Sequence, residues 1–308
     1  MAKSFRKTIR HLIKAHFPYL WVKHKYYTTI GKKLSIANPR DINEKIIWLE
    51  YFTDTREWTT FADKYAVRDL VRDKLGEEVL IPLLGMWKHI EDIDFSILPE
   101  KFVIKLNNGS NDVIIVREKG KTDLEFVRKQ LYKSLHNNFG METGEWHYLR
   151  IKPCIIAEKL LEVDDVRGLV DYKIWCFGGK PHSILLCSNR DKQIHKVDLN
   201  YYDLDWNRHP EKMAPEVRNN LEYPKPDNFD LMLEYASKLS AGLPEARVDF
   251  YNINGKIYFG ELTLSSYRGM MYYYTQETLN EMGALCVLPD RSWKEKVKMM
   301  FFRYLPQF

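Results

Sequence analysis

The stretch ARVDFYNINGKIYFGELT, residues 246–263, carries four polar side chains that could act together. They are Arg247 and Asp249 before the Asn254-Gly255 dipeptide, and Glu261 and Thr263 after it. Polar and apolar residues alternate on both sides of this dipeptide, which predicts a β-hairpin. Carboxylates are the hard oxygen ligands that Mg²⁺ takes when nucleotide phosphates complete its coordination shell. A metal site is therefore one interpretation of the stretch.

The length of the turn decides whether the two carboxylates meet. A two-residue Asn254-Gly255 loop would put Asp249 and Glu261 on opposite faces of the sheet. A three-residue loop that also includes Ile253 sets Arg247 opposite Glu261, with Asp249 diagonal to it. We favour the longer loop, because it also gathers the apolar residues Val248, Phe250 and Leu262 on the other face. A half-exposed hairpin with a solvated charged face would show the same residues, so the stretch alone leaves both readings open.

Length and composition indicate a folded protein without a membrane span. The chain has 308 residues, of which 45% are hydrophobic and 14% aromatic, as is typical of a globular core. No run approaches the roughly 18 apolar residues of a membrane span, and the N-terminus lacks a signal-peptide core. We therefore expect a cytoplasmic protein. The four cysteines lack zinc-ligand spacing and are expected to be reduced: Cys154, Cys176, Cys187 and Cys286.

Both ends of the chain are basic. Residues 1–35 contain nine lysines and arginines and no acidic residue. Residues 4–17 have the periodicity of an amphipathic helix, which either packs on the body with a solvated basic face or lies on the inner face of an anionic membrane. Residues 291–308 have a similar character. We find no recognised nucleic-acid-binding motif and expect no nucleic-acid partner.

The elements that must position the hairpin change from helices to strands near residue 100. Before that point, the stretch TFADKYAVRDLVRDKLG predicts one helix that ends at Gly76. After it, we expect a hairpin around NNGSN, a helix at 123–138, the strand CIIAEKLL, two strands that turn at Gly178-Gly179, and a helix at 228–241 that leads into the quoted hairpin.

Taken in order, these segments resemble the TupA-like branch of the ATP-grasp enzymes, which is named for teichuronopeptide synthesis and often labelled glycosyltransferase. The resemblance extends over roughly residues 35–290 and rests on these stretches: DINEKIIWLEYF, ADKYAVRDLV, LIPLLGMW, LPEKFVIKLNNGSNDVIIV, IIAEKLLE, DYKIWCFGGKP, YYDLDWN and RVDFYNINGKIYFGELT. It implies an α+β fold in which two lobes clasp a nucleotide. The implied regions are a basic arm at 1–35, a helical region at 36–100, a small lobe at 101–161, a large lobe with the metal hairpin at 162–290, and a basic C-terminal helix at 291–308.

The resemblance also implies a site for ATP and Mg²⁺. Lys105 ends an apolar strand before a loop whose N–H groups and small side chains can close over phosphates. The implied phosphate contacts are Lys64, on a helix, together with Lys105, Asn108, Gly109, Ser110 and Lys173. The implied adenine and ribose contacts are Glu158, Lys159, Leu160, Glu162 and Asp165. The implied metal ligands are Asp249, Glu261 and Thr263, although Thr263 stands where many ATP-grasp enzymes have asparagine, and LSSYRG after it departs from the branch's Gly- and Pro-rich turn.

By resemblance, the reaction is an ATP- and Mg²⁺-dependent joining of a carboxylate to an amine through an acylphosphate, which Lys105, Arg247 and Arg190 would assist. The implied substrates are an acidic sugar or polysaccharide acceptor, as in capsule, lipopolysaccharide or teichuronic polymers, and an amino acid or other amine. One alternative is a nucleotide-sugar glycosyltransferase, because DLD at 203–205 superficially resembles its metal motif. Another is a membrane-associated binding module that uses the basic arms.

Overall fold

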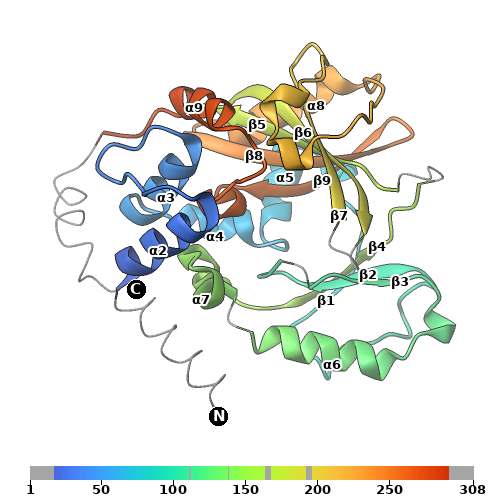
Figure 1. The fold of residues 1–308 in the computed structure, drawn as a ribbon. Coiled ribbons are helices and arrows are strands. Elements are labelled where there is room, and N and C mark those ends of the chain that lie inside the picture. The colour runs from blue at the N-terminus through green and yellow to red at the C-terminus, as the bar shows by residue number, and fades with distance from the viewer. Residues whose placement is uncertain (1–16, 111, 138, 164–167, 192–195, 291–308) are drawn as a thin grey trace.

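The computed structural model describes residues 17–110, 112–137, 139–163, 168–191 and 196–290. Within these ranges the chain forms helices and two antiparallel sheets, so the fold belongs to the α+β class (Figure 1). The helices are α2 (Pro18–Ile30), α3 (Ile42–Phe52), α4 (Arg56–Ala62), α5 (Val67–Leu75), α6 (Leu124–Leu135), α7 (Phe139–Thr143), α8 (Phe229–Ser240) and α9 (Gln276–Leu285). The helices expected at 4–17 and 291–308 lie outside the described residues.

A four-stranded sheet with the order β1-β4-β2-β3 forms the smaller body. Its strands are β1 (Leu83–Trp87), β2 (Phe102–Leu106), β3 (Ile114–Val116) and β4 (Ile155–Lys159). Side chains alternate in burial along β2, so Phe102, Ile104 and Leu106 face a core that Val127 and Leu131 of α6 complete. In Figure 1, α6 lies along this sheet. β1 belongs to the sheet although it falls within the region expected to be helical.

A five-stranded sheet with the order β7-β6-β5-β8-β9 forms the larger body. Its strands are β5 (Asp171–Phe177), β6 (Lys180–Asp191), β7 (Lys196–Tyr202), β8 (Glu245–Ile253) and β9 (Lys256–Thr263). Phe250 of β8 contacts Tyr235 of α8, so the even-numbered side chains of β8 face that helix. The odd-numbered residues Arg247 and Asp249 consequently face the other side, where Lys173 of β5 lies directly opposite Asp249.

The helix predicted over TFADKYAVRDLVRDKLG is interrupted. α4 ends at Ala62 and α5 begins at Val67. The Asp63 carboxylate accepts hydrogen bonds from the N–H groups of Tyr65 (2.9 Å) and Ala66 (3.1 Å), and such a local bond competes with the helical ladder. Lys64 therefore lies in a turn, and its expected place on a helix was wrong. The predicted end at Gly76 is confirmed, since its φ is +97°.

The β8–β9 hairpin brings the two acids together by a route that differs from our prediction. Ile253 pairs with Lys256, so the loop has two residues, and Asn254 and Gly255 both have positive φ (50° and 78°). The predicted three-residue loop was wrong. The ladder then shifts by one residue, because Gly260 is inserted as a β-bulge between the pairs Phe250–Phe259 and Asp249–Glu261. This bulge returns Glu261 and Thr263 to the face that carries Arg247 and Asp249.

Candidate active site

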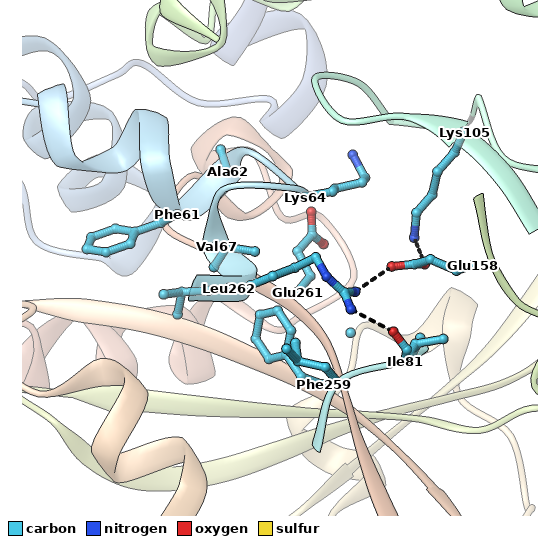
Figure 2. A pocket seen from close by; sticks show the side chains of 13 residues that line it. Phe61, Ala62, Lys64, Val67, Ile81, Lys105, Glu158, Phe259, Glu261 and Leu262 are labelled. Atoms are coloured by element: carbon cyan, nitrogen blue, oxygen red, sulfur yellow. Dashed lines mark hydrogen bonds and ion pairs between the residues drawn. The ribbon is translucent and has the colours of Figure 1, made fainter. Parts of the chain in front are cut away.

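A pocket lies where the two sheets approach each other (Figure 2). Lys105 and Glu158 line it from the small sheet, Lys64 from the α4–α5 turn, Arg68 from α5, and Glu261 from the hairpin. The rest of its wall is mainly apolar and includes Phe61, Val67, Leu80, Ile81, Phe259 and Leu262. The pocket thus brings together residues that the resemblance implied to contact the phosphates, the adenine and the metal ion.

Glu158 is held between two cations at one side of this pocket. Its carboxylate lies 2.6 Å from Lys105 Nζ and 3.1 Å from Arg68 Nη1, and the Glu158 and Arg68 side chains are about as buried as core residues. Arg68 also donates to the carbonyl of Ile81 at 2.9 Å. A buried carboxylate with two charge-assisted partners is strongly oriented. These contacts fix Lys105 at the end of β2, with its ammonium in the pocket.

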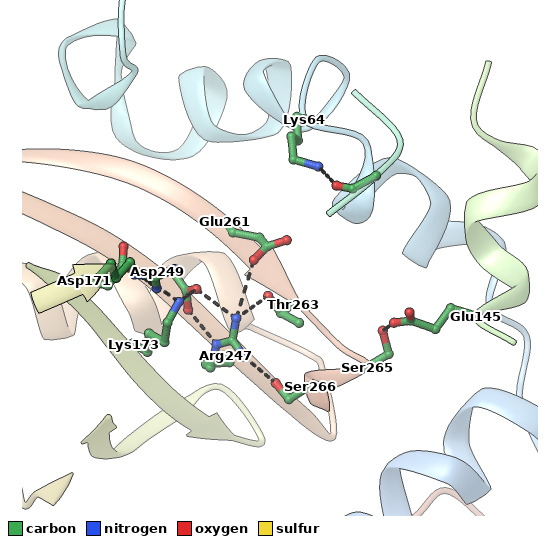
Figure 3. Close-up of polar contacts among 12 residues, drawn as sticks. Lys64, Glu145, Asp171, Lys173, Arg247, Asp249, Glu261, Thr263, Ser265 and Ser266 are labelled. Carbon is green, nitrogen blue, oxygen red and sulfur yellow. Dashed lines mark hydrogen bonds and ion pairs between the residues drawn. The ribbon is translucent and has the colours of Figure 1, made fainter. Parts of the chain in front are cut away.

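Lys64 joins the α4–α5 turn to the loop after β2. Its ammonium donates to the Gly109 carbonyl (Figure 3). Burial lowers the pKa of Lys64, and the nearby carboxylates of Glu261 and Asp112 partly oppose that shift. The loop itself is anchored by buried Asn107, which donates to Asp63 (2.9 Å) and to the Lys152 carbonyl (3.1 Å) and accepts from the Cys154 N–H (2.7 Å). Of the other loop residues, Asn108 is half-buried and Ser110 is exposed.

Arg247 is the centre of the polar network on the large sheet (Figure 3). Its guanidinium makes a bidentate contact with Asp249 at 2.7 and 2.9 Å. It also donates to Thr263 (3.0 Å) and Ser266 (3.1 Å), and lies 3.5 Å from Glu261. Burial alone would lower the pKa of Arg247, but Asp249 raises it well above its usual value. The guanidinium therefore keeps its charge although only 9% of the residue is exposed.

Asp249 carries a negative charge in a buried setting because two cations face it. Burial raises the pKa of this carboxyl, but Arg247 and Lys173, which ion-pairs with it, lower the pKa below the usual value overall. Lys173 also lies 3.7 Å from Asp171, which in turn pairs with Arg190. Burial would lower the pKa of Lys173, whereas Asp171 and Asp249 raise it. Charges of both signs thus alternate along this face.

The hairpin carries a donor set that fits Mg²⁺ in kind. Glu261 and Asp249 lie directly opposite each other, and the hydroxyl of Thr263 is on the same face. A carboxylate has about four lone-pair sites, and Asp249 uses three of them for Arg247 and Lys173. The side chain of Glu261 is 38% exposed and lies 3.5 Å from Arg247. Among the described residues, no group of three or more His, Cys, Asp or Glu side chains could hold a metal ion by itself.

The comparison that decides the family comes from the sequence model of the TupA-like ATPgrasp family, which matches residues 44–287. The chain belongs to this family. The match includes both sheets, the pocket between them and the β8–β9 hairpin. No curated protein has a sequence that matches this chain significantly.

Solved ATP-grasp structures resemble this TupA-like chain at low sequence identity. D-alanine–D-alanine ligase from Bacillus anthracis, complexed with ATP, is 15% identical, with a TM-score of 0.37 over 73% of this chain and 65% of that one. The D-cycloserine synthetase DcsG is 15% identical, with a TM-score of 0.42 over 76% and 72%. The ADP complex of PurK, an N5-carboxyaminoimidazole ribonucleotide synthetase, is 14% identical, with a TM-score of 0.46 over 80% and 58%. The chain therefore spans less than two thirds of the first and third of these proteins.

The residues assigned by resemblance to adenine and ribose lie at the end of β4. Glu158 faces the pocket, whereas the side chain of Lys159 is exposed and its N–H donates to the Pro82 carbonyl at 2.9 Å. Leu160 is buried. Glu162 lies 2.8 Å from Lys101 in an exposed pair. Asp165 lies outside the described residues, so its predicted role remains a prediction.

The DLD triplet occupies a turn after β7. The Asp203 carboxylate accepts from the N–H groups of Asp205 (3.0 Å) and Asn207 (2.8 Å). It also contacts His209 at 2.9 Å. Its oxygens are thus engaged in local hydrogen bonds that shape the turn. We find nothing in this geometry that favours the glycosyltransferase reading.

Sequence reasoning missed several residues of the network. Arg68 falls in the stretch TFADKYAVRDLVRDKLG and Asn107 in the stretch NNGSN, and neither residue was assigned a role. Ser266 follows the hairpin in a turn where Tyr267 and Arg268 have positive φ (47° and 58°), which is rare for residues other than glycine. Its neighbour Ser265 donates to the buried carboxylate of Glu145 at 2.6 Å. The departure of LSSYRG from the expected turn was the only signal in this region of the sequence.

Proposed function

We propose that this protein is an ATP- and Mg²⁺-dependent ligase that joins a carboxylate to an amine. One observation carries the proposal: the bulged hairpin turns Arg247, Asp249 and Glu261 to one face, and Glu261 shares a pocket with Lys64 and Lys105. Membership of an ATP-grasp family supports a nucleotide as the occupant of this pocket. Complexes of distant ATP-grasp ligases with ATP, or with ADP and Mg²⁺, agree with this assignment.

The proposed nucleotide lies with its phosphates between the two sheets. Lys64, Lys105 and the loop N–H groups at 108–110 neutralise and orient the triphosphate. Lys173 approaches it from the large sheet. Asp249, Glu261 and Thr263 would hold Mg²⁺, and the bound ion would neutralise charge on the phosphates. The end of β4, residues 158–162, takes the adenine and ribose, together with Asp165.

The proposed chemistry has two steps. A carboxylate oxygen of the acid attacks the γ-phosphorus, the bond from that phosphorus to the β-bridging oxygen breaks, and ADP leaves. The amine nitrogen then attacks the acyl carbon, inorganic phosphate leaves, and the nitrogen loses a proton to solvent. Both steps develop negative charge on oxygen, which Arg247, Lys105 and Arg190 stabilise by their fixed positive charge. The protein supplies position and charge, and no covalent nucleophile is required.

The acid that we propose is an acidic sugar, free or within a surface polysaccharide, and the amine is an amino acid or related compound. Arg190 supports an acidic substrate, because its side chain is 51% exposed beside Asp171, at the edge of the network. An exposed guanidinium is suited to bidentate recognition of a carboxylate.

The test measures ADP release by the purified chain with Mg²⁺-ATP, candidate sugar acids and amines. We expect Glu261→Gln to lower turnover roughly 100-fold or more, as for removal of a group that stabilises transition-state charge. Asp249→Asn should also lower turnover, but it removes the negative charge that neutralises the buried cations Arg247 and Lys173 and can therefore destabilise the fold. Glu261→Gln is therefore decisive, since its half-exposed side chain can change without unfolding the protein.

The matched control is Asp230→Asn, because the Asp230 side chain is 93% exposed and does not line the pocket. It should retain parental turnover. Thermal-shift titration adds a second readout, in which Mg²⁺-ATP raises the melting temperature. Stabilisation by a UDP-sugar in place of ATP, or the absence of ADP with every acid and amine, would contradict the proposal.

A further inference from the structure

Helix α2 is fixed to the body by one face. Val22 and Tyr26 are 2% and 0% exposed and belong to the large hydrophobic core. Trp21 packs against Gly144, where a β-carbon would come within 2.5 Å of the indole ring. The helix ends at Gly31, which has a φ of +81°. In Figure 1, α2 lies at the edge of the molecule, close to α7.

The opposite face of α2 exposes apolar side chains. Leu20 and Tyr27 are 54% and 57% exposed, and Phe17, just before the helix, is 44% exposed. Leu20 and Tyr27 are seven residues apart, so they lie on the same side of the helix, two turns from each other. Lys23 and His24 are exposed between them. Residues 17–35 include four lysines and no acidic residue.

We propose that this face of α2, formed by Leu20, Lys23, His24 and Tyr27, docks on an anionic lipid bilayer. The side chains project from a convex helix surface, so the apolar ends can enter the boundary between headgroups and acyl chains. The lysines then remain at the level of the lipid phosphates. Tyrosine is suited to this boundary because it has an apolar ring and a polar end. The charge complementarity favours anionic over neutral lipid, and the inference does not depend on the ligase reaction.

The experiment is co-sedimentation of the full chain with vesicles of phosphatidylcholine, with and without phosphatidylglycerol. We expect binding only to vesicles that contain phosphatidylglycerol. Binding should weaken as salt rises, because surface charges more than a Debye length apart, about 3 Å at 1 M, are screened. Equal binding to neutral vesicles, or no binding at low salt, would overturn the proposal.

Variants locate the surface. Leu20→Asp with Tyr27→Asp should reduce vesicle binding at least tenfold. The matched control is Phe126→Asp with Tyr132→Asp on α6, since these side chains are 56% and 55% exposed. The control should bind vesicles as the parent does. Thermal melts establish that both double variants are folded, because the four positions are exposed.

Replacement of a lysine tests the electrostatic part. Lys23→Gln should weaken binding by about fivefold, since a basic residue near an anionic surface contributes roughly 1 kcal/mol. Unchanged binding by the α2 variants would show that another surface is responsible and would overturn the assignment. The assignment would also be overturned if an oligonucleotide displaced the parent from vesicles and bound the α2 variants less tightly, because the partner of α2 would then be nucleic acid.

Discussion

Burial has opposite outcomes for two carboxyl groups of this protein. Asp249 is buried beside Arg247 and Lys173, and these cations keep its pKa below the usual value against the effect of burial. Glu50 is also buried, but burial raises its pKa to about 8, against smaller opposing effects of a Trp146 backbone hydrogen bond and Arg268. Its Oε1 lies 3.6 Å from His147 Nδ1. The charged partner, and not burial itself, decides which acid is ionised at neutral pH.

Two buried groups, Glu50 and His147, make the free energy of unfolding depend on pH. Between its usual value of 4.5 and about 8, Glu50 holds a proton in the folded state that the unfolded chain releases, so stability is lost as the pH rises through this window. His147 has the opposite effect. Burial lowers its pKa from 6.5 to about 4, so stability is gained as the pH rises from 4 to 6.5. The two contributions oppose each other below 6.5, and that of Glu50 remains above it.

We therefore predict that the free energy of unfolding in urea falls between pH 6.5 and 8, and that Glu50→Gln removes about 2 kcal/mol of this fall, at 1.36 kcal/mol for each pH unit. Exposed Glu57 on α4 provides the control, since Glu57→Gln should keep the parental slope. Parallel profiles for the parent and Glu50→Gln would contradict the assignment.

At the scale of elements, the β8–β9 hairpin depends on its bulge. The sequence predicted correctly that Asp249 and Glu261 face the same side, but for the wrong reason. The alternation of apolar residues predicts which side chains face the core, and in that respect the prediction was right. It does not predict at which position of the ladder a β-bulge inserts the extra residue. Gly260 gives no local signal of a bulge, because glycine in a strand also occurs where backbones approach closely.

Gly260→Val tests this geometry. A β-carbon at position 260 would come within 3.1 Å of the Asp249 carbonyl oxygen, so valine disfavours the bulge. In an unbroken ladder from the two-residue turn, residue 260 would lie opposite Asp249, Glu261 and Thr263 would move to the α8 face, and Leu262 would be exposed. We expect at least roughly 100-fold lower ADP formation, with loss of stability from the exposed leucine and the buried acid. Insertion of two residues between Asn254 and Gly255 is the control, because it lengthens an exposed tip and keeps the register. Parental activity of Gly260→Val would contradict this role of the bulge.

At the scale of the whole molecule, Arg68 connects the two bodies. It lies on α5, which packs against α8 of the larger body, and it holds Glu158 of the small sheet. Its role could not be predicted, since periodicity shows that a basic residue lies on a helix but not which distant carboxylate it meets. The order of segments, by contrast, was enough for the family and for the α+β class.

We predict that Arg68→Met lowers the free energy of unfolding by about 2 kcal/mol, because it removes one charged partner from a buried carboxylate and leaves Lys105 as the other. Arg72→Met, on the same helix, is the control. Its pairs with Asp69 and Glu77 are exposed, and such pairs contribute at most about 1 kcal/mol. Urea unfolding measures both, and equal losses would contradict the bridging role.

The inserted glycine also bears on how relatives of this protein should be aligned. Across a two-residue turn, partners in a regular ladder are separated by an even number of intervening positions, whereas Asp249 and Glu261 are separated by an odd number. The quantity to compare among homologues is thus whether the number of residues between the two acids is odd or even. Homologues in which this number differs by two can keep a single β-bulge. Those in which it differs by one must either lack the bulge or have a second one.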